Sequence, residues 1–168
     1  MGEGWFPPFL FVSLGMIMKE TSIKLSSQVL GESESVIARQ ETNDCVVRAL
    51  AAMSGSTYDQ AHAYAREVLG RKNGSGVRLG ILKGNIQKGM MGKSFTPVDV
   101  NTRYKCYGEV VERQMTVGTF FKKASKRQTF LIVVKGHIFC MKEGVVVGGN
   151  YNDVAQLRKR IHKAWLVK

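Results

Sequence analysis

The stretch RQETNDCVVRALA, residues 39–51, decides the fold because it joins a polar run to an apolar helical pattern. Its apolar positions recur at spacings of three and four, as on one face of a helix. These positions are Val46, Val47 and Leu50, and Met53 continues the pattern just beyond the stretch. Asn43 or Asp44 is suited to cap the start of this helix, and Gly55 is suited to end it. We therefore expect a helix over residues 44–54.

Cys45 falls in the first turn of that expected helix. The unpaired N–H groups and the dipole at a helix N-terminus favour an anion, and a thiolate rather than a thiol is the nucleophile. A free cysteine is also among the most commonly buried residues. The stretch thus leaves two alternatives, a nucleophile or a core thiol, and residues elsewhere in the chain must separate them.

Length and composition are those of an ordinary globular protein. The chain has 168 residues, of which 44% are hydrophobic and 23% charged, which suits one domain with its own core rather than a disordered chain. We expect an N-terminal extension over residues 1–35 and a compact domain over residues 36–168. The net charge of +12 favours an acidic partner, either an acidic protein surface, a nucleic acid or an anionic membrane.

Cysteine and histidine spacing gives no metal or disulfide pattern. Wide gaps separate the three cysteines, Cys45, Cys106 and Cys140. The three histidines also lack the spacing of metal ligands, and they are His62, His137 and His162. We expect no cofactor, no metal and a reducing compartment such as the cytoplasm.

The N-terminal stretch WFPPFLFVSLGMIM, residues 5–18, is apolar and uncharged. It is too short to span a membrane comfortably, and Glu3 as the only preceding charge does not suit a signal peptide. Three interpretations fit: translation that begins at Met16 or Met18, an arm that docks on another chain, and a weak membrane anchor. We favour the first two and expect no transmembrane span.

The rest of the chain predicts helices followed by strands. Two further helices are expected over residues 57–69, with Thr57 as the cap, and 117–125, with Thr116 as the cap, and a short one within residues 81–90. A period of two then predicts three strands over residues 130–134, 138–142 and 145–147. The basic tail favours a short helix or a strand. Helices first and an antiparallel sheet later define an α+β fold.

A histidine and an amide come together in this expected sheet. His137 follows Gly136 and opens a strand. Across the hairpin at residues 143–144, the end of the next strand returns beside His137, which brings Asn150 close, with Asp153 as the alternative orienting residue. The backbone N–H of Cys45 and the side-chain amide of Gln40 are candidate oxyanion donors.

The segments QETNDC and RAL, followed by KGHIFCMKEGVVVGGN, resemble the papain-like cysteine peptidase superfamily. The closest likeness is to the compact branch with the bacteriocin-processing peptidase domains of export transporters, and to small papain-like proteins of phages and other viruses. The resemblance covers roughly residues 36–152. It implies that Cys45 is the nucleophile, His137 the base, Asn150 the orienting residue and Gln40 the oxyanion donor, and that an N-terminal helical part packs on a C-terminal antiparallel sheet.

The leading hypothesis is therefore a thiol-dependent hydrolase of amide or peptide bonds, with a protein or peptide as substrate. In many such peptidases a small residue follows the nucleophile, whereas Val46 stands there and is expected to crowd the substrate. Outside the site, we interpret Cys140 as a core residue, Cys106 as a surface or edge thiol, His62 as a surface or packing residue of its helix, and His162 as part of a solvated basic face.

A second hypothesis is a catalytically silent papain-like scaffold that serves as a structural or binding component, for instance of a viral particle. An exposed basic face near the C-terminus would then bind acidic protein or nucleic acid. The residues of this basic face are Arg158, Lys159, Arg160 and Lys163. In this hypothesis the apolar arm docks on a partner chain, and the protein is cytoplasmic or associated with the virion.

Overall fold

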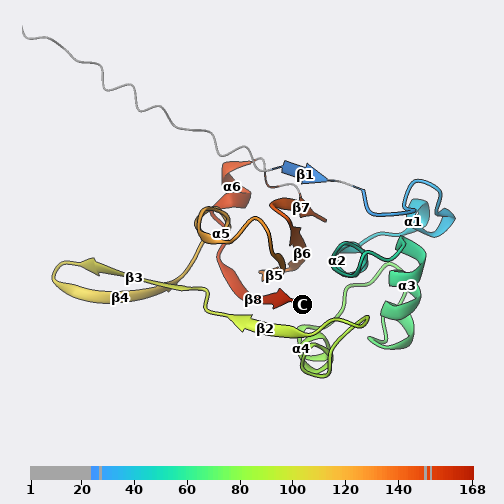
Figure 1. Cartoon of the computed structure of the whole chain (residues 1–168), viewed down its shortest axis with the longest axis horizontal. Coiled ribbons are helices and arrows are strands. Elements are labelled where there is room, and N and C mark those ends of the chain that lie inside the picture. The colour runs from blue at the N-terminus through green and yellow to red at the C-terminus, as the bar shows by residue number, and fades with distance from the viewer. Residues whose placement is uncertain (1–23, 27, 150, 152) are drawn as a thin grey trace, which may run out of the picture.

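A six-stranded sheet forms the centre of the molecule (Figure 1). The computed structural model describes residues 24–26, 28–149, 151 and 153–168, so the expectations for residues 1–23 lie outside the described residues. Neighbouring strands are antiparallel except for the first pair, which is parallel. In spatial order the strands are β1 (Lys24–Ser26), β7 (Val145–Val147), β6 (His137–Lys142), β5 (Thr129–Val134), β8 (Ile161–Val167) and β2 (Phe95–Val98).

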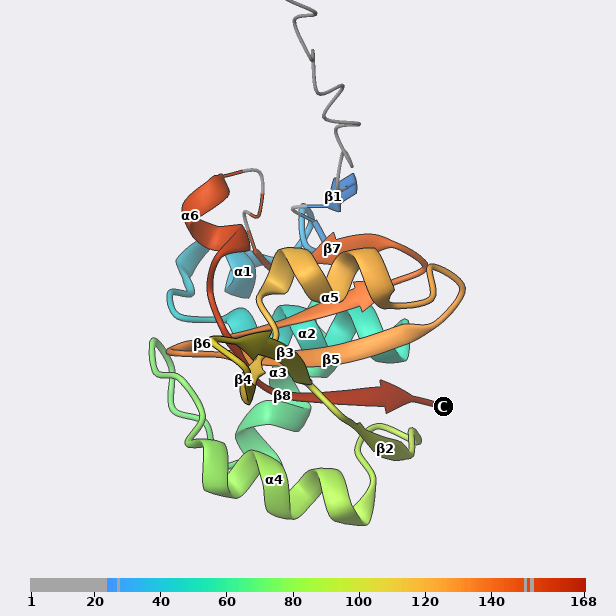
Figure 2. The same ribbon diagram turned by 90° about the vertical axis from the view of Figure 1, so that its left-hand side faces the viewer.

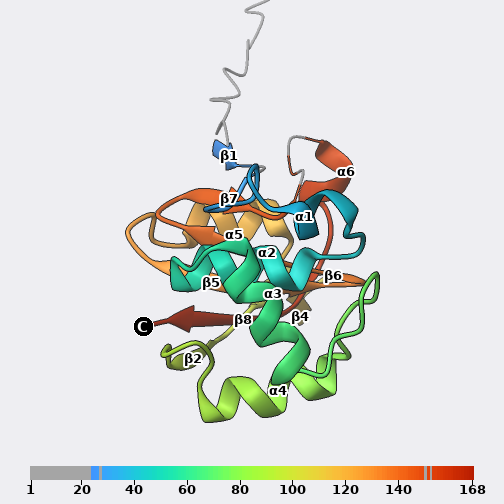
Figure 3. The same cartoon turned by 90° about the vertical axis from the view of Figure 1, so that its right-hand side faces the viewer.

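Helices cover both faces of this sheet. Helices α2 (Cys45–Ser54) and α3 (Tyr58–Glu67) lie on one side (Figure 3), and α5 (Val117–Lys123) lies on the other (Figure 2). Alternation along β5 fills both interfaces, since Leu131 packs toward α2 and Ile132 toward α5. This confirms the α+β arrangement, with N-terminal helices on a C-terminal sheet that contains His137 and Cys140.

Helix α2 begins at Cys45 and ends at Ser54, as its sequence predicts. Gly55 closes it with a left-handed φ of 75°. Asp44 occupies the N-cap position, but its carboxylate makes no cap hydrogen bond and instead accepts from Arg48 Nε at 2.9 Å and from the Tyr58 hydroxyl at 3.0 Å. The start of α2 is therefore tied to α3 rather than capped by Asp44.

The other predicted helices and strands also form. Thr57 caps α3 through a capping box with Gln60, and Thr116 caps α5. The tail forms both a helix, α6 (Val154–Leu157), and a strand, β8. The short helix expected within residues 81–90 is α4 (Leu79–Lys88), while α1 (Val36–Gln40) and β2 were not anticipated.

Strands β3 (Asn101–Cys106) and β4 (Glu109–Gln114) form a separate hairpin that projects from the body of the protein (Figure 1). Tyr107 and Gly108 form its tip, with φ values of 50° and 86°. Such a turn needs positive φ at both central positions and usually has Asn or Asp before the glycine. A tyrosine that is fully exposed at this place is therefore unusual.

Contacts with the domain begin before residue 36. Strand β1 pairs in parallel with β7, and the Leu30 carbonyl accepts a hydrogen bond from the Tyr58 amide at 2.8 Å. Glu32 also pairs with Arg48 of α2 at 2.7 Å. Part of the segment expected as an extension thus packs on the body of the protein.

A buried carboxylate, Glu41, joins the loop before α2 to α3 and to the loop that follows it. Glu41 contacts His62 Nε2 at 2.9 Å through one oxygen, while its other oxygen accepts from Arg71 at 2.7 Å and from the Gly74 amide at 3.1 Å. Asn43 donates to the Gly74 carbonyl at 3.0 Å. His62 is therefore a packing residue of α3. Arg71 and Gly74, in the loop after α3, are held against the residues that precede Cys45.

The acid stability of the protein should depend on Glu41. The Arg71 guanidinium lowers the pKa of Glu41 from 4.5 to about 2, against the opposing effect of burial and with help from His62 and Gly74. A lowered carboxyl pKa stabilises the fold above pH 4.5, and this contribution is lost as the pH falls from 4.5 to about 2. This difference in pKa between the unfolded and folded states corresponds to roughly 3 kcal/mol of folding free energy.

We expect Glu41→Gln to lower the free energy of unfolding by about 3 kcal/mol at pH 7 and by much less near pH 2. Urea denaturation across this pH range measures the effect. The control is Glu112→Gln, because Glu112 pairs with Arg103 on the exposed hairpin at 3.7 Å and should contribute less than about 1 kcal/mol. A Glu41→Gln difference that is the same at pH 7 and pH 2 would contradict the assignment.

Candidate functional site

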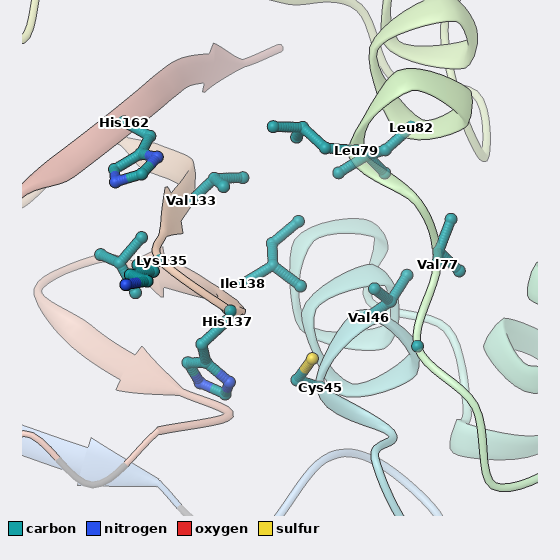
Figure 4. Close-up of a pocket in the computed structure, with 13 residues that line it drawn as sticks. Cys45, Val46, Val77, Leu79, Leu82, Val133, Lys135, His137, Ile138 and His162 are labelled. Atoms are coloured by element: carbon teal, nitrogen blue, oxygen red, sulfur yellow. The ribbon is translucent and has the colours of Figure 1, made fainter.

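A cleft of about 340 Å³ lies between α2, β6 and the loop before α4 (Figure 4). Cys45 is the first residue of α2 and His137 the first residue of β6, and both line this cleft. Gly76 and Val77 line it from the loop that Gly74 anchors. Helix α2 packs against β6, so two residues more than ninety positions apart in the sequence line one shared cleft.

A hydrogen bond to the backbone after β7 orients the His137 ring. Its Nε2 lies 2.7 Å from the Gly148 carbonyl oxygen. Because a carbonyl oxygen can only accept, Nε2 must carry the hydrogen, and in the neutral ring Nδ1 keeps its lone pair. The ring also stacks on Phe139, with centroids 6.2 Å apart. His137 is therefore held in the tautomer that has a basic Nδ1.

The surroundings of His137 favour the neutral imidazole. Burial lowers the pKa of His137 below its ordinary value of 6.5, and the charge of Lys159 lowers it further. The hydrogen bond to Gly148 and the charge of Asp44 act in the opposite direction, but they do not outweigh these effects. At neutral pH, His137 is able to accept a proton.

The Gly148 carbonyl occupies the place opposite His137 at which the sequence suggested an orienting side chain. Asn150 lies outside the described residues. The alternative, Asp153, caps α6 by accepting from the Ala155 amide at 3.0 Å. Gln40, the expected oxyanion donor, is the exposed last residue of α1. The orienting group that the structure describes is thus a backbone carbonyl, which a search for side-chain motifs does not detect.

Two glycines allow this backbone to approach the site. A side chain at Gly148 would lie 3.5 Å from the Cβ of Arg48 in α2, and one at Gly149 would lie 3.3 Å from His137 Nε2 and collide with the Tyr151 ring. Gly148 also has a left-handed φ of 88°. The loop after β7 therefore fits closely between the first turn of α2 and the His137 ring.

Tyr151 is a site residue that the sequence did not indicate. It is buried beside the histidine, with ring centroids 4.4 Å from Phe139 and 6.5 Å from His137. Its hydroxyl is buried and has no hydrogen-bond partner among the described residues, and burial, with a smaller effect of Cys45, raises its pKa. Tyr151 thus remains protonated and supports the His137 ring from the side of α5.

The remaining thiols and His162 lie in different surroundings. Cys140 is fully buried in β6, as expected, and burial raises the pKa of its thiol to about 12. Cys106 is half-buried in the projecting hairpin. His162 is exposed, but it also lines the cleft that contains Cys45, a position that the basic sequence around it did not suggest.

The four residues expected to form a basic face are all exposed: Arg158, Lys159, Arg160 and Lys163. They lie where α6 leads into β8, beside the base of the β3–β4 hairpin. Arg160 donates to the Gln114 carbonyl at the end of β4 at 2.6 Å, and the Ile161 amide donates to the Met115 carbonyl at 2.9 Å. The structure thus joins this basic face to the hairpin.

No protein-family model, curated protein or solved structure matches this chain. Within the part of the chain that the structure describes, no group of three or more His, Cys, Asp or Glu residues could hold a metal ion. None of the helices described is long and apolar enough to cross a membrane.

Gly149→Ala should disturb the site directly. Because the new methyl group collides with Tyr151 and crowds His137, we expect the free energy of unfolding to fall by about 1–3 kcal/mol and the alkylation of Cys45 to slow. Chemical denaturation and mass-spectrometric labelling with iodoacetamide measure the two effects.

Gly80→Ala in α4 is the matched control, since a methyl group there meets no atom within 4 Å. We expect it to leave labelling unchanged and to raise stability by up to about 1 kcal/mol, because alanine favours the helix. If Gly149→Ala and Gly80→Ala have the same effect on stability and on Cys45 labelling, Gly149 is not needed for the loop after β7 to approach His137.

Proposed function

We propose that this protein is a thiol-dependent hydrolase of amide or peptide bonds with a papain-like site, in which Cys45 is the nucleophile and His137 the base. The observation that carries the proposal is the shared cleft, in which a cysteine at the start of α2 meets a histidine whose Nδ1 is left basic by the Nε2 bond to Gly148. This arrangement supports the proposal that Cys45 is a nucleophile rather than a core thiol.

The reaction needs only groups of this site and water. The Cys45 proton passes to His137 Nδ1, and the thiolate attacks the substrate carbonyl carbon. The backbone N–H of Cys45 stabilises the oxyanion, with the Gln40 amide proposed as a second donor. His137 then returns the proton to the leaving amine, which departs as a thioester forms. Water, deprotonated by His137, hydrolyses the thioester and restores the thiol.

In this proposal, the backbone after β7 orients His137. The Gly148 carbonyl oxygen lies 2.7 Å from Nε2, accepts its hydrogen bond and stabilises the imidazolium as it forms. We propose Asn150 as a further orienting residue from its place in the sequence, directly after Gly148 and Gly149. Val46 is buried and lines the cleft directly after Cys45 in the sequence, so it narrows the space beside the proposed nucleophile.

Alkylation of Cys45 by iodoacetamide tests the proton transfer. In a Cys106→Ala background, the rate should fall only below pH 6.5, because the lowered pKa keeps His137 neutral down to that range. His137→Gln should slow the reaction at pH 6.5 by about 10- to 100-fold, since an unassisted thiol is mostly protonated there. Cys45→Ala should abolish labelling.

The outcome against the proposal is equally specific. Cys140 is fully buried, so labelling of the folded Cys106→Ala protein reports on Cys45. If the pH profile of that labelling is the same with and without His137, then His137 does not activate the thiol. Cleavage of a peptide library that is lost in both Cys45→Ala and His137→Gln would establish the hydrolase activity itself.

We infer a second function, nucleic-acid binding by the basic face together with the hairpin. The observation that favours it is that the basic face is joined through Arg160 to the base of a hairpin whose projecting tip exposes Tyr107. Within the hairpin, Arg113 lies over the Tyr104 ring at 5.4 Å. Cations that contact phosphates and aromatic rings that stack on bases are the combination that single strands require.

Fluorescence anisotropy with a labelled single-stranded oligonucleotide tests this function. The triple variant Arg158→Glu, Lys159→Glu and Lys163→Glu should lose at least tenfold in affinity, and binding should weaken steeply as salt rises. The control, Lys72→Glu, Arg78→Glu and Lys88→Glu, changes the net charge equally on other elements. Equal losses in both variants, or equal binding of poly-glutamate, would contradict a nucleic-acid site on this face.

A further inference from the structure

The cleft continues beyond Cys45 and His137 and changes in character along its length. Apolar side chains line its middle, as Figure 4 shows: Val46, Val77, Leu79, Leu82, Val133 and Ile138. His162 lies at the far end, and Lys135 lies beside the strand that leads to His137. A volume of about 340 Å³ is within the range of pockets that bind small ligands or side chains.

A β-bulge places His162 at this position. Val133 pairs with Lys163 and Val134 pairs with Ile161, so His162 has no partner on β5. The extra residue makes His162 and Lys163 consecutive exposed positions between the buried Ile161 and Ala164. Bulges of this kind redirect side chains and are common beside active sites. The irregular pairing thus brings a polar, basic side chain to an otherwise apolar cleft.

The charges around the cleft are mostly positive. Lys135 lines it, and Lys159 acts on His137 from the α6–β8 segment. The imidazole of His162 also lines the cleft and can donate a hydrogen bond. Asp44 is the acidic group that acts on His137, and its carboxylate is already bound by Arg48 and Tyr58. Among residues 24–168 without 27, 150 and 152, no carboxylate forms an ion pair with Lys135, Lys159 or His162.

We propose that the cleft selects a peptide in which an apolar residue is adjacent to an acidic one. The apolar side chain fills the middle of the cleft, and the carboxylate binds to the basic side chains Lys135 and His162, which line the same cleft. The proposal rests on the proposed hydrolase in that the bound peptide is its substrate. It adds the substrate class, and it assigns His162 and Lys135 as specificity-determining residues.

Binding to the Cys45→Ala variant tests the selection without any chemistry. The probes are fluorescein-labelled hexapeptides with a leucine beside Glu, Gln or Lys, in both orders, and a peptide with serine beside Glu. We expect the Leu–Glu peptide to bind about tenfold more tightly than the Leu–Gln peptide at low salt, and more tightly still than the Leu–Lys peptide. The Ser–Glu peptide should also bind more weakly, because it leaves the apolar middle unfilled.

Adding Lys135→Gln and His162→Gln should remove the difference between the Glu, Gln and Lys peptides while keeping the difference between leucine and serine. Lys88→Gln, at the end of α4 and outside the cleft, is the control of matched type and should keep both differences. Equal binding of the Glu and Lys peptides to the Cys45→Ala protein overturns the proposal. A preference for the Glu peptide over the Gln and Lys peptides that survives the double substitution overturns it as well.

The two proposals can fail separately. If Cys45 is alkylated at a rate that depends on His137 but the peptides show no preference, the hydrolase stands and the assigned specificity is wrong. If the preference is present but Cys45 has no dependence on His137, the cleft is a selective peptide-binding site and the hydrolase is wrong.

Discussion

The hydrogen bond between His137 Nε2 and the Gly148 carbonyl is the contact on which the site depends. It closes the open end of the β6–β7 hairpin, where the strands have stopped pairing, and so fixes the first residue of β6 against the residues after β7. Because the acceptor is a carbonyl, the bond also selects the tautomer of the ring. One contact therefore couples the geometry of the sheet to the acid–base state of the candidate base.

The nucleophile is positioned by a different set of contacts. Asp44 holds the start of α2 to α3 through Tyr58, and Glu41 holds the preceding loop to Arg71 and Gly74. The Glu41 carboxylate is almost fully buried, so its partners must satisfy its charge or the loop would not keep this conformation. The two halves of the cleft thus come from separate networks that meet where α2 packs on β6.

Local sequence rules predicted much of this arrangement. The boundaries of α2 followed from its apolar spacing and Gly55, and His137 was placed correctly at the start of a strand because Gly136 interrupts the apolar run. The return of the chain past β7 toward His137 followed from the hairpin at residues 143–144. These features depend on neighbours within a few residues, which is where sequence patterns are most informative.

Other features depend on contacts between distant segments. Nothing in the sequence around His162 indicates a bulge, since the bulge arises from a register shift against β5. The burial of Tyr151 requires the aromatic cluster of α5 and β6, and the role of Gly148 belongs to its backbone rather than its side chain. Strand β2 contains Pro97, which suits an edge strand but obscures a strand pattern in the sequence.

The parallel pairing of β1 with β7 determines which strand lies at this edge of the sheet. Without residues 24–26, β7 would be an edge strand with unpaired amides and carbonyls, and such edges invite pairing with other chains. Strand β1 thus shields β7, the strand that leads into Gly148, from pairing with other chains.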